Sequence, residues 1–133
     1  MYHKIIVVGH LGKKPEMRYT PTGQAVTSFS VATSRKYTSN EQQVTETIWM
    51  RVSVWGKAAE ACNNYLDKGA LVLVEGRLNP DKASGGPKVF QKQDGASSAS
   101  YDMTALEVKF LSGKGEGAVH QAEAPIAEDD IPF

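Results

Sequence analysis

The sequence predicts an all-β protein with a single helix, and three observations lead to this prediction. Five segments are rich in β-branched and aromatic residues and are separated by turn residues. The segment between Gly56 and Gly69 instead carries apolar residues at helical spacing. Hydrophobic residues make up 41% of the 133 residues, which is enough for one packed domain. We therefore expect one compact β-domain.

The five predicted strands follow one another along the chain. They are residues 3–9, 25–37, 47–55, 71–78 and 100–111. The first strand is continuous in β-branched residues, which predicts burial on both faces for part of its length. A change of alternation near Thr104 and Ala105 predicts a β-bulge in the fifth. The polar residues 38–46 predict an exposed loop or hairpin tip.

One helix is expected between the third and fourth strands. Its apolar stripe consists of Ala58, Ala61, Cys62, Tyr65 and Leu66. Gly69 is the expected helix stop. A helix at this point among five strands is typical of the OB-fold, a Greek-key barrel, in which the helix covers one barrel end. Since Cys62 lies on the apolar stripe, we interpret it as a core residue and not as a nucleophile.

The formal net charge is zero, but the two parts of the chain differ in sign. Residues 1–111 contain 14 Lys and Arg against 10 Asp and Glu, whereas residues 112–133 contain one Lys against five acids. The second part is rich in Gly and Ala and has no periodicity. We predict an OB domain over 1–111, a flexible, disordered linker over 112–127 and an acidic protein-interaction tip over 128–133.

Several classes of function are disfavoured. A single cysteine excludes an internal disulfide and a cysteine-cluster zinc site, and indicates a reducing compartment, most simply the cytoplasm. No apolar run is long enough for a membrane span or a signal peptide. The histidines His3, His10 and His120 are scattered, and no phosphate-binding loop or catalytic spacing is present. We therefore expect no cofactor, no metal and no enzymatic activity.

The third strand carries the most informative pattern. Because side chains alternate along a strand, one face receives Ile48, Met50, Val52 and Val54, and the other receives Trp49, Arg51, Ser53 and Trp55. The first set is the predicted core. On the second face, two indoles beside a guanidinium suit stacking of unpaired bases and contact with phosphate. The alternative is that these tryptophans pack under a loop or in a subunit interface.

Aromatic residues beside cations occur twice more. The second strand ends in Arg35, Lys36 and Tyr37, and a short β-like segment carries Lys88, Phe90 and Lys92 on one face. Stacking tolerates any base, and few side chains are placed to read base edges. The helix has cations only near its ends, which disfavours recognition of duplex DNA. These residues predict binding of a single strand without sequence preference.

Five segments resemble bacterial single-stranded DNA-binding proteins. They are residues 6–19 (IVVGHLGKKPEMRY), 47–60 (TIWMRVSVWGKAAE), 65–69 (YLDKG), 74–78 (VEGRL) and 129–133 (DDIPF). The resemblance implies a cytoplasmic, nucleoid-associated homotetramer of OB domains that coats single-stranded DNA in replication, recombination and repair. It also implies that Trp49 stacks on bases, that Trp55 and Tyr37 occupy similar aromatic positions, and that Phe90 replaces another. The tip, Asp129, Asp130, Ile131, Pro132 and Phe133, is similar to a segment that docks on replication and repair enzymes.

Three alternatives remain from the residues alone. An OB protein that prefers RNA is the nearest. An adaptor that binds protein or oligosaccharide through the same face is the second, and a small enzyme is the third. Quenching of tryptophan fluorescence by single-stranded DNA distinguishes the adaptor from the nucleic-acid binder.

Overall fold

The computed structural model describes residues 1–112, which contain seven strands and one helix. In chain order they are β1 (Ile5–Leu11), β2 (Glu16–Tyr19), β3 (Ala25–Ser39), β4 (Gln42–Trp55), α1 (Lys57–Tyr65), β5 (Leu71–Leu78), β6 (Lys88–Gln91) and β7 (Ser97–Phe110). Ser112, which was expected to begin the linker, is buried, and its Oγ accepts a hydrogen bond from the backbone N–H of Leu71 at 2.8 Å. The rest of the predicted linker and the acidic tip lie outside the described residues.

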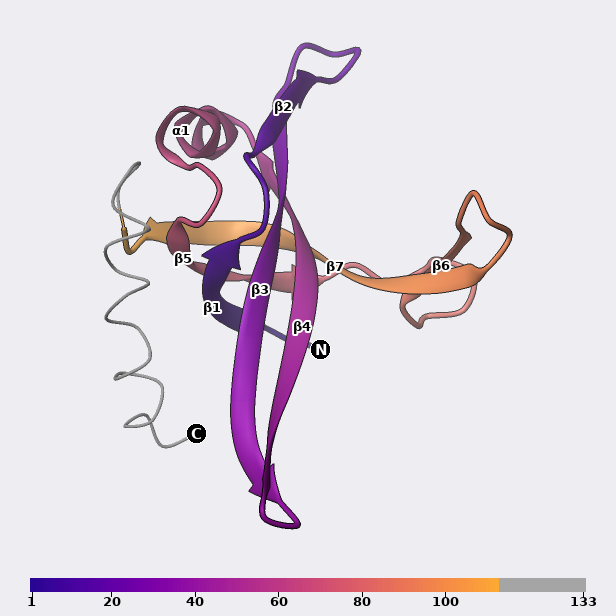
Figure 1. The fold of residues 1–133 in the computed structure, drawn as a ribbon. Helices are drawn as coiled ribbons and strands as arrows, with labels where there is room; N and C mark the ends of the chain where they lie inside the picture. The colour runs from indigo at the N-terminus through magenta and orange to yellow at the C-terminus, as the bar shows by residue number, and fades with distance from the viewer. Residues whose placement is uncertain (113–133) are drawn as a thin grey trace.

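Five of the strands close into a barrel (Figure 1). β1 pairs with β5, β5 with β7, β7 with β4, β4 with β3, and β3 again with β1. The β4–β7 pair is parallel and the others are antiparallel. With α1 between the third and fourth barrel strands, this is the OB-fold, so the predicted fold is confirmed. β2 and β6 pair only with β3 and β7, respectively.

Two glycines allow the barrel strands to approach one another. A Cβ atom on Gly9 would overlap the backbone carbonyl of Ala32, close to where β1 begins to pair with β3. A Cβ atom on Gly76 would overlap the carbonyl of Thr104. The register of β5 with β7 shifts at the same point, leaving Leu106 as an extra residue in β7. The β-bulge predicted near Thr104 is thereby confirmed.

The helix covers one end of the barrel core, as predicted, but with a different set of residues. Ala59, Cys62 and Leu66 are buried in the core, whereas Ala58 and Tyr65 are exposed. The stripe predicted from apolar residues alone was therefore displaced around the helix, from the buried face toward Ala58 and Tyr65. The helix also ends at Tyr65, where Leu66 is already extended, and Gly69 lies in the following turn at φ 85°. The prediction that Gly69 stops the helix was wrong.

Two strand predictions need correction. The first strand is buried on one face only, because the outer side chains Ile6 and Val8 are 56% and 45% exposed. Ile48, predicted as core, is 49% exposed, although Met50, Val52 and Val54 are buried. Ile48 has the correct alternation, but it lies where β4 leaves the barrel and no core covers it.

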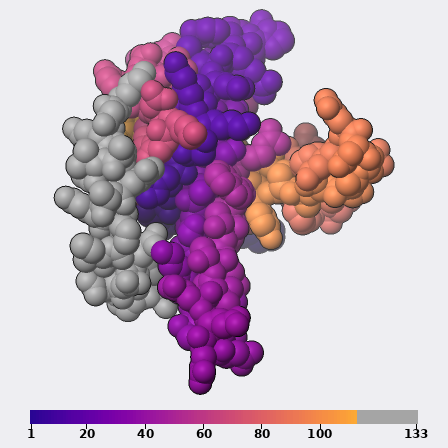
Figure 2. Space-filling view, in the orientation of Figure 1, coloured from indigo at the N-terminus to yellow at the C-terminus, as the bar shows by residue number. Residues whose placement is uncertain are grey.

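Two hairpin arms extend from the barrel (Figures 1 and 2). The first is the outer part of β3 and β4, whose strands pair as far as Ser39 and Gln42 and turn at Asn40 and Glu41. Residues 38–46 are therefore mostly paired strand and only their tip is a loop. Polar side chains do not prevent a ladder, because backbone groups make its hydrogen bonds. The second arm is β6 with the start of β7.

Candidate nucleic-acid interface

The side chains of β4 divide between two faces as the sequence predicted. Met50, Val52 and Val54 point into the core. Trp49 and Trp55 alternate with them and are 52% and 43% exposed, with Arg51 exposed between them. The indoles are therefore not covered by a loop within residues 1–112. Both rings and the guanidinium are accessible to a ligand on this side of the sheet.

Small residues of β3 form the floor beside these aromatic and cationic groups. In the β3–β4 register, Ser28 lies opposite Ser53, Ser30 opposite Arg51, and Ala32 opposite Trp49. Directly opposite residues in a sheet share a face. We call these six residues the outer face: Ser28, Ser30, Ala32, Trp49, Arg51 and Ser53. Its small side chains on β3 leave room for a flat ligand next to Trp49.

Three hollows meet on the outer face, and Ser30 borders all of them. The largest, about 530 Å³, lies where β4 and β7 diverge and is lined by Trp49, Arg51 and Tyr101, among others. A second, about 250 Å³, is bordered by Lys13, Lys14 and Arg51. A third, also about 250 Å³, lies between Lys13 and Trp49. We call these three hollows together the depression; two of them border Arg51 and the third borders Trp49.

Free cations surround this depression. Among the described residues, no carboxylate lies within ion-pair distance of Arg51, Lys13 or Lys14. By contrast, the Nζ of Lys88 lies 3.5 Å from an Oδ of Asp102, a mostly buried carboxylate that also accepts a 2.6 Å hydrogen bond from Ser100. Arg51, Lys13 and Lys14 therefore remain available to an anionic ligand, in a hollow that Glu16 and Asp102 also line.

The second arm continues the same surface. The β6–β7 register places Lys88 opposite Ser100 and Phe90 opposite Ser98, so Lys88 and Phe90 share a face with Asp102. Asp102 lies opposite Arg51 in the β4–β7 register. The ion pair with Asp102 thus holds Lys88 near Arg51, whereas Phe90 lies further out on the arm, opposite Ser98. β6 ends at Gln91, so Lys92 belongs to the turn and not to the strand as expected.

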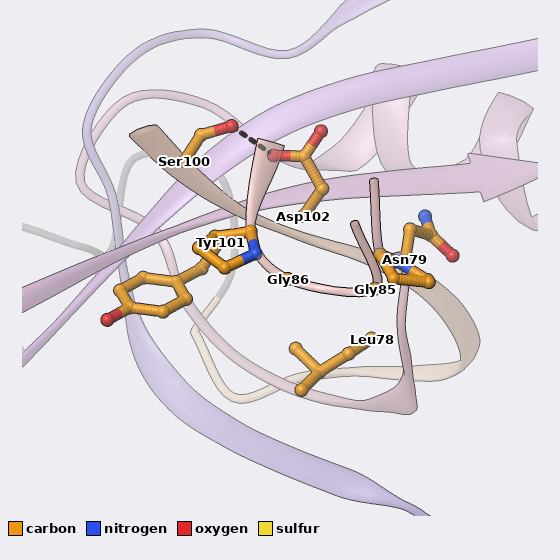
Figure 3. Close-up of a pocket in the computed structure, with 9 residues that line it drawn as sticks. Leu78, Asn79, Gly85, Gly86, Ser100, Tyr101 and Asp102 are labelled. Atoms are coloured by element: carbon orange, nitrogen blue, oxygen red, sulfur yellow. Dashed lines mark hydrogen bonds between the residues drawn. The ribbon is translucent and has the colours of Figure 1, made fainter. Parts of the chain in front are cut away.

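Tyr101 is an exposed aromatic residue that the sequence reasoning did not single out. It is 55% exposed and lines both the 530 Å³ hollow and a smaller one of about 190 Å³. Figure 3 shows the residues of the smaller hollow. The smaller hollow lies beside Leu78 and the Gly85–Gly86 loop, and the Tyr101 ring points away from that loop. Tyr101 and the lysines Lys13 and Lys14 join the site only through long-range pairing, because their local sequence carries no signal.

The arm formed by β3 and β4 places the third predicted cluster on two faces. Lys36 is on the side of Ala32 and Trp49, whereas Arg35 and Tyr37 are on the opposite side, which continues the core face. There the carboxylate of Glu46 accepts hydrogen bonds from Arg35 at 3.0 Å and from the Tyr37 hydroxyl at 3.1 Å. The hydrogen bond and the negative charge of Glu46 raise the pKa of Tyr37. Within residues 1–112, Lys36 has no acidic partner.

Comparison with known proteins agrees with this geometry. A family model described as the single-strand binding protein family matches residues 2–111. The chain belongs to this family. Within residues 1–112, no group of three or more acidic, histidine or cysteine residues could hold a metal ion, and no helix has both the length and the apolar character needed to cross a membrane. The resemblance stated from the sequence is confirmed.

Relatives of this single-strand binding family member come from diverse bacteria. A single-stranded DNA-binding protein of Neisseria meningitidis serogroup B is 41% identical over 117 residues, which cover 87% of the chain and 63% of the relative. One of Xanthomonas campestris pv. campestris is 42% identical over 118 residues, covering 86% and 63%. One of Helicobacter hepaticus is 32% identical over 118 residues, covering 88% and 65%. The chain thus spans less than two thirds of each relative's length.

Proposed function

We propose that this protein binds single-stranded DNA without sequence preference along the outer face. The observation that carries the proposal is the exposure of Trp49 beside the guanidinium of Arg51, which has no ion-pair partner among residues 1–112, over a floor of small residues. An indole stacks on any base because every base has a π-face. A guanidinium neutralises the phosphate that accompanies the base. Family membership and the relatives' names support the same substrate.

The proposed path of the DNA strand follows the depression. Lys13 and Lys14 are at one side, Trp49 and Arg51 in the middle, and Tyr101 leads to the β6–β7 arm. We assign Phe90, Lys88 and Lys92 to contacts along that arm. Along the arm of β3 and β4 we assign contacts to Lys36 on the side of the outer face and to Arg35 and Tyr37 on the opposite side, so the DNA strand passes around this arm. Trp55 is four residues from Arg51 on the same face of β4, or about 13 Å along the strand. One chain can therefore engage several successive nucleotides.

Exclusion of duplex DNA follows from the same geometry. Stacking needs bases whose faces are free, which a duplex does not offer. α1 lies over the core and has no basic residue in its last turn, so it is not a groove-reading helix. The protein acts by binding and protection and not by catalysis, without cofactor or metal. Its cellular role is protection of single strands in replication, recombination and repair, in the cytoplasm and on the nucleoid.

Recruitment of replication and repair enzymes is assigned to the acidic tip. Asp129 and Asp130 supply charge for a basic pocket, and Ile131, Pro132 and Phe133 supply apolar contacts. The support is the sequence resemblance and the charge split between residues 1–111 and 112–133. Deletion of Phe133 is expected to abolish docking while leaving DNA affinity unchanged.

Association into a homotetramer is supported by the outer side of β1. Ile6 and Val8 are large apolar side chains that alternate with buried residues and face solvent in one chain. An exposed apolar strand face of this kind is typical of an interface. We propose that copies of the chain cover it, which also brings several DNA-binding faces into one particle.

The experiment that tests the proposed function compares four ligands by tryptophan fluorescence. Oligo-dT should quench emission with saturation and in a salt-dependent manner, and oligo-rU, duplex DNA and a neutral oligosaccharide should bind more weakly. Tighter binding of rU would indicate the RNA-preferring alternative. No response to either nucleic acid would favour the adaptor.

A further inference from the structure

Three charged and aromatic side chains form a closed cluster on the arm of β3 and β4. Arg35 and Glu46 are directly opposite in the register, and Tyr37 is two residues further along β3. One carboxylate oxygen of Glu46 accepts from the Arg35 guanidinium at 3.0 Å, and the other accepts from the Tyr37 hydroxyl at 3.1 Å. Both oxygens of a single carboxylate are therefore used by two candidate DNA contacts.

The same cluster covers the aromatic ring. The Cζ atom of Arg35 lies 4.8 Å from the centre of the Tyr37 ring, within the range of a cation–π contact. Glu46 holds the guanidinium in this position from across the hairpin. A base that approached this face of Tyr37 would meet Arg35 first. One face of the Tyr37 ring and the cation are thus engaged together, while the rest of Tyr37 stays exposed.

We infer that Glu46 is an internal substitute for a DNA phosphate, which the bound strand displaces from Arg35 and Tyr37. The inference rests on the proposed function and adds its regulation. In the free protein Glu46 occupies Arg35 and Tyr37, and these two side chains contact DNA only when a phosphate takes the place of Glu46. A carboxylate and a phosphate present similar oxygens to a guanidinium. Arg51, which has no such partner among residues 1–112, binds without this competition.

The strength of the cluster suits displacement. Arg35 and Glu46 side chains are 68% and 52% exposed. Exposed ion pairs are weak and screened by salt, so a polyanion can replace Glu46 at modest cost. Removing the charge of Glu46 should therefore increase affinity by only about two- to five-fold. Without the charge of Glu46, DNA binding should also release one more cation. The slope of the log of the binding constant against the log of the salt concentration should then be steeper by about 0.7.

The test uses two isosteric substitutions on one arm. Glu46→Gln removes the acid that holds Arg35, and Glu41→Gln removes an acid at the arm tip that has no ion pair among the described residues. Both change the net charge equally and both positions are exposed. Affinity for labelled oligo-dT is measured at several salt concentrations for these variants, for Arg35→Gln and for Arg35→Gln combined with Glu46→Gln.

We expect Glu46→Gln to bind about two- to five-fold more tightly than Glu41→Gln, with the steeper salt dependence. In the Arg35→Gln background, the advantage of Glu46→Gln over Glu41→Gln should disappear. Equal affinities of the two glutamine variants would overturn the inference, as would an advantage that persists without Arg35. If the unmodified protein does not bind oligo-dT at all, the proposed function is itself overturned, and the inference with it.

Discussion

The indole of Trp49 lies directly against the backbone of Gly12. A Cβ atom on residue 12 would be 2.5 Å from Cζ3 and 2.8 Å from Cη2 of the ring, closer than side chains pack. Gly12 follows β1, and its backbone N–H donates to the carbonyl of Ser30 on the floor of the outer face. The glycine therefore sets how close to the floor the ring can lie.

Substitution of Gly12 by alanine should displace the indole and weaken DNA binding. Gly12 does not have a positive φ, so alanine causes no backbone strain there and the ring must move instead. Since a stacked base is worth about 1–3 kcal/mol, partial loss should reduce affinity for oligo-dT about fivefold or more. The measurement is an oligo-dT titration, together with the emission maximum of the free protein.

Gly86→Ala is the matched control for this prediction. Its Cβ atom would meet only Ser84 Oγ, at an ordinary 3.6 Å. We expect native affinity and an unchanged emission maximum for this control. If Gly12→Ala behaves in the same way as Gly86→Ala, the close packing of Gly12 and Trp49 has no role in binding.

Neutralising Arg51 should reduce the salt dependence of binding. Arg51 has no acidic partner within residues 1–112, so its charge is available for one phosphate. Arg51→Gln should make the log–log slope shallower by about 0.7 and lower the affinity. Lys68→Gln, in the turn after α1, removes the same charge at a residue that lines none of the three hollows and should leave the slope unchanged. A slope that does not differ between the two variants would argue against a phosphate at Arg51.

A charge on the outer side of β1 should disrupt association. The unmodified protein is expected to have four times the chain mass of 14.4 kDa in light scattering. Val8→Lys places an ammonium on the exposed apolar face of β1 and should lower that mass, because a buried unpaired charge is costly. Val89→Lys, the same change at an exposed valine on β6, should retain the full mass. If both variants keep the fourfold mass, the interface lies elsewhere on the chain.

The thiol of Cys62 should make stability fall at alkaline pH. Burial raises the pKa of Cys62 from 9.0 to about 11. The pKa of the thiol is higher in the folded than in the unfolded protein. The stability that the neutral, buried thiol contributes is therefore complete below pH 9 and is lost as the pH rises from 9 to 11. The loss should be about 2–3 kcal/mol in the free energy of unfolding. Urea titrations of the unmodified protein and Cys62→Ala at pH 8 to 11 measure it, and parallel pH profiles would contradict it.

The sequence was sufficient for the fold and for the face of β4 on which Trp49 and Arg51 lie, because both depend on local alternation. Trp49 and Arg51 lie on the face opposite Met50 in any strand containing them. Helix boundaries and the exposure of Ile48 were missed, since they depend on where the barrel stops covering a strand. Local pattern determines the face of a residue, but tertiary packing determines whether that face is covered.

The remaining parts of the site come from pairings between distant segments. Lys13 and Tyr101 reach the hollows that Arg51 also lines through the closure of β1 on β3 and the parallel pairing of β4 with β7. The contact of Glu46 with Arg35 requires the hairpin register, and a shift by one residue would put them on opposite faces. No local motif specifies these relationships.

The most direct test of stacking on the outer face is the affinity of Trp49→Ala for labelled oligo-dT. Loss of one stacked base, worth about 1–3 kcal/mol, should weaken binding about 5- to 150-fold. Tyr65→Ala removes an exposed aromatic ring on α1 and should bind as the unmodified protein does. If Trp49→Ala keeps its native circular dichroism spectrum and binds oligo-dT as tightly as Tyr65→Ala, the strand is not held by stacking on this face.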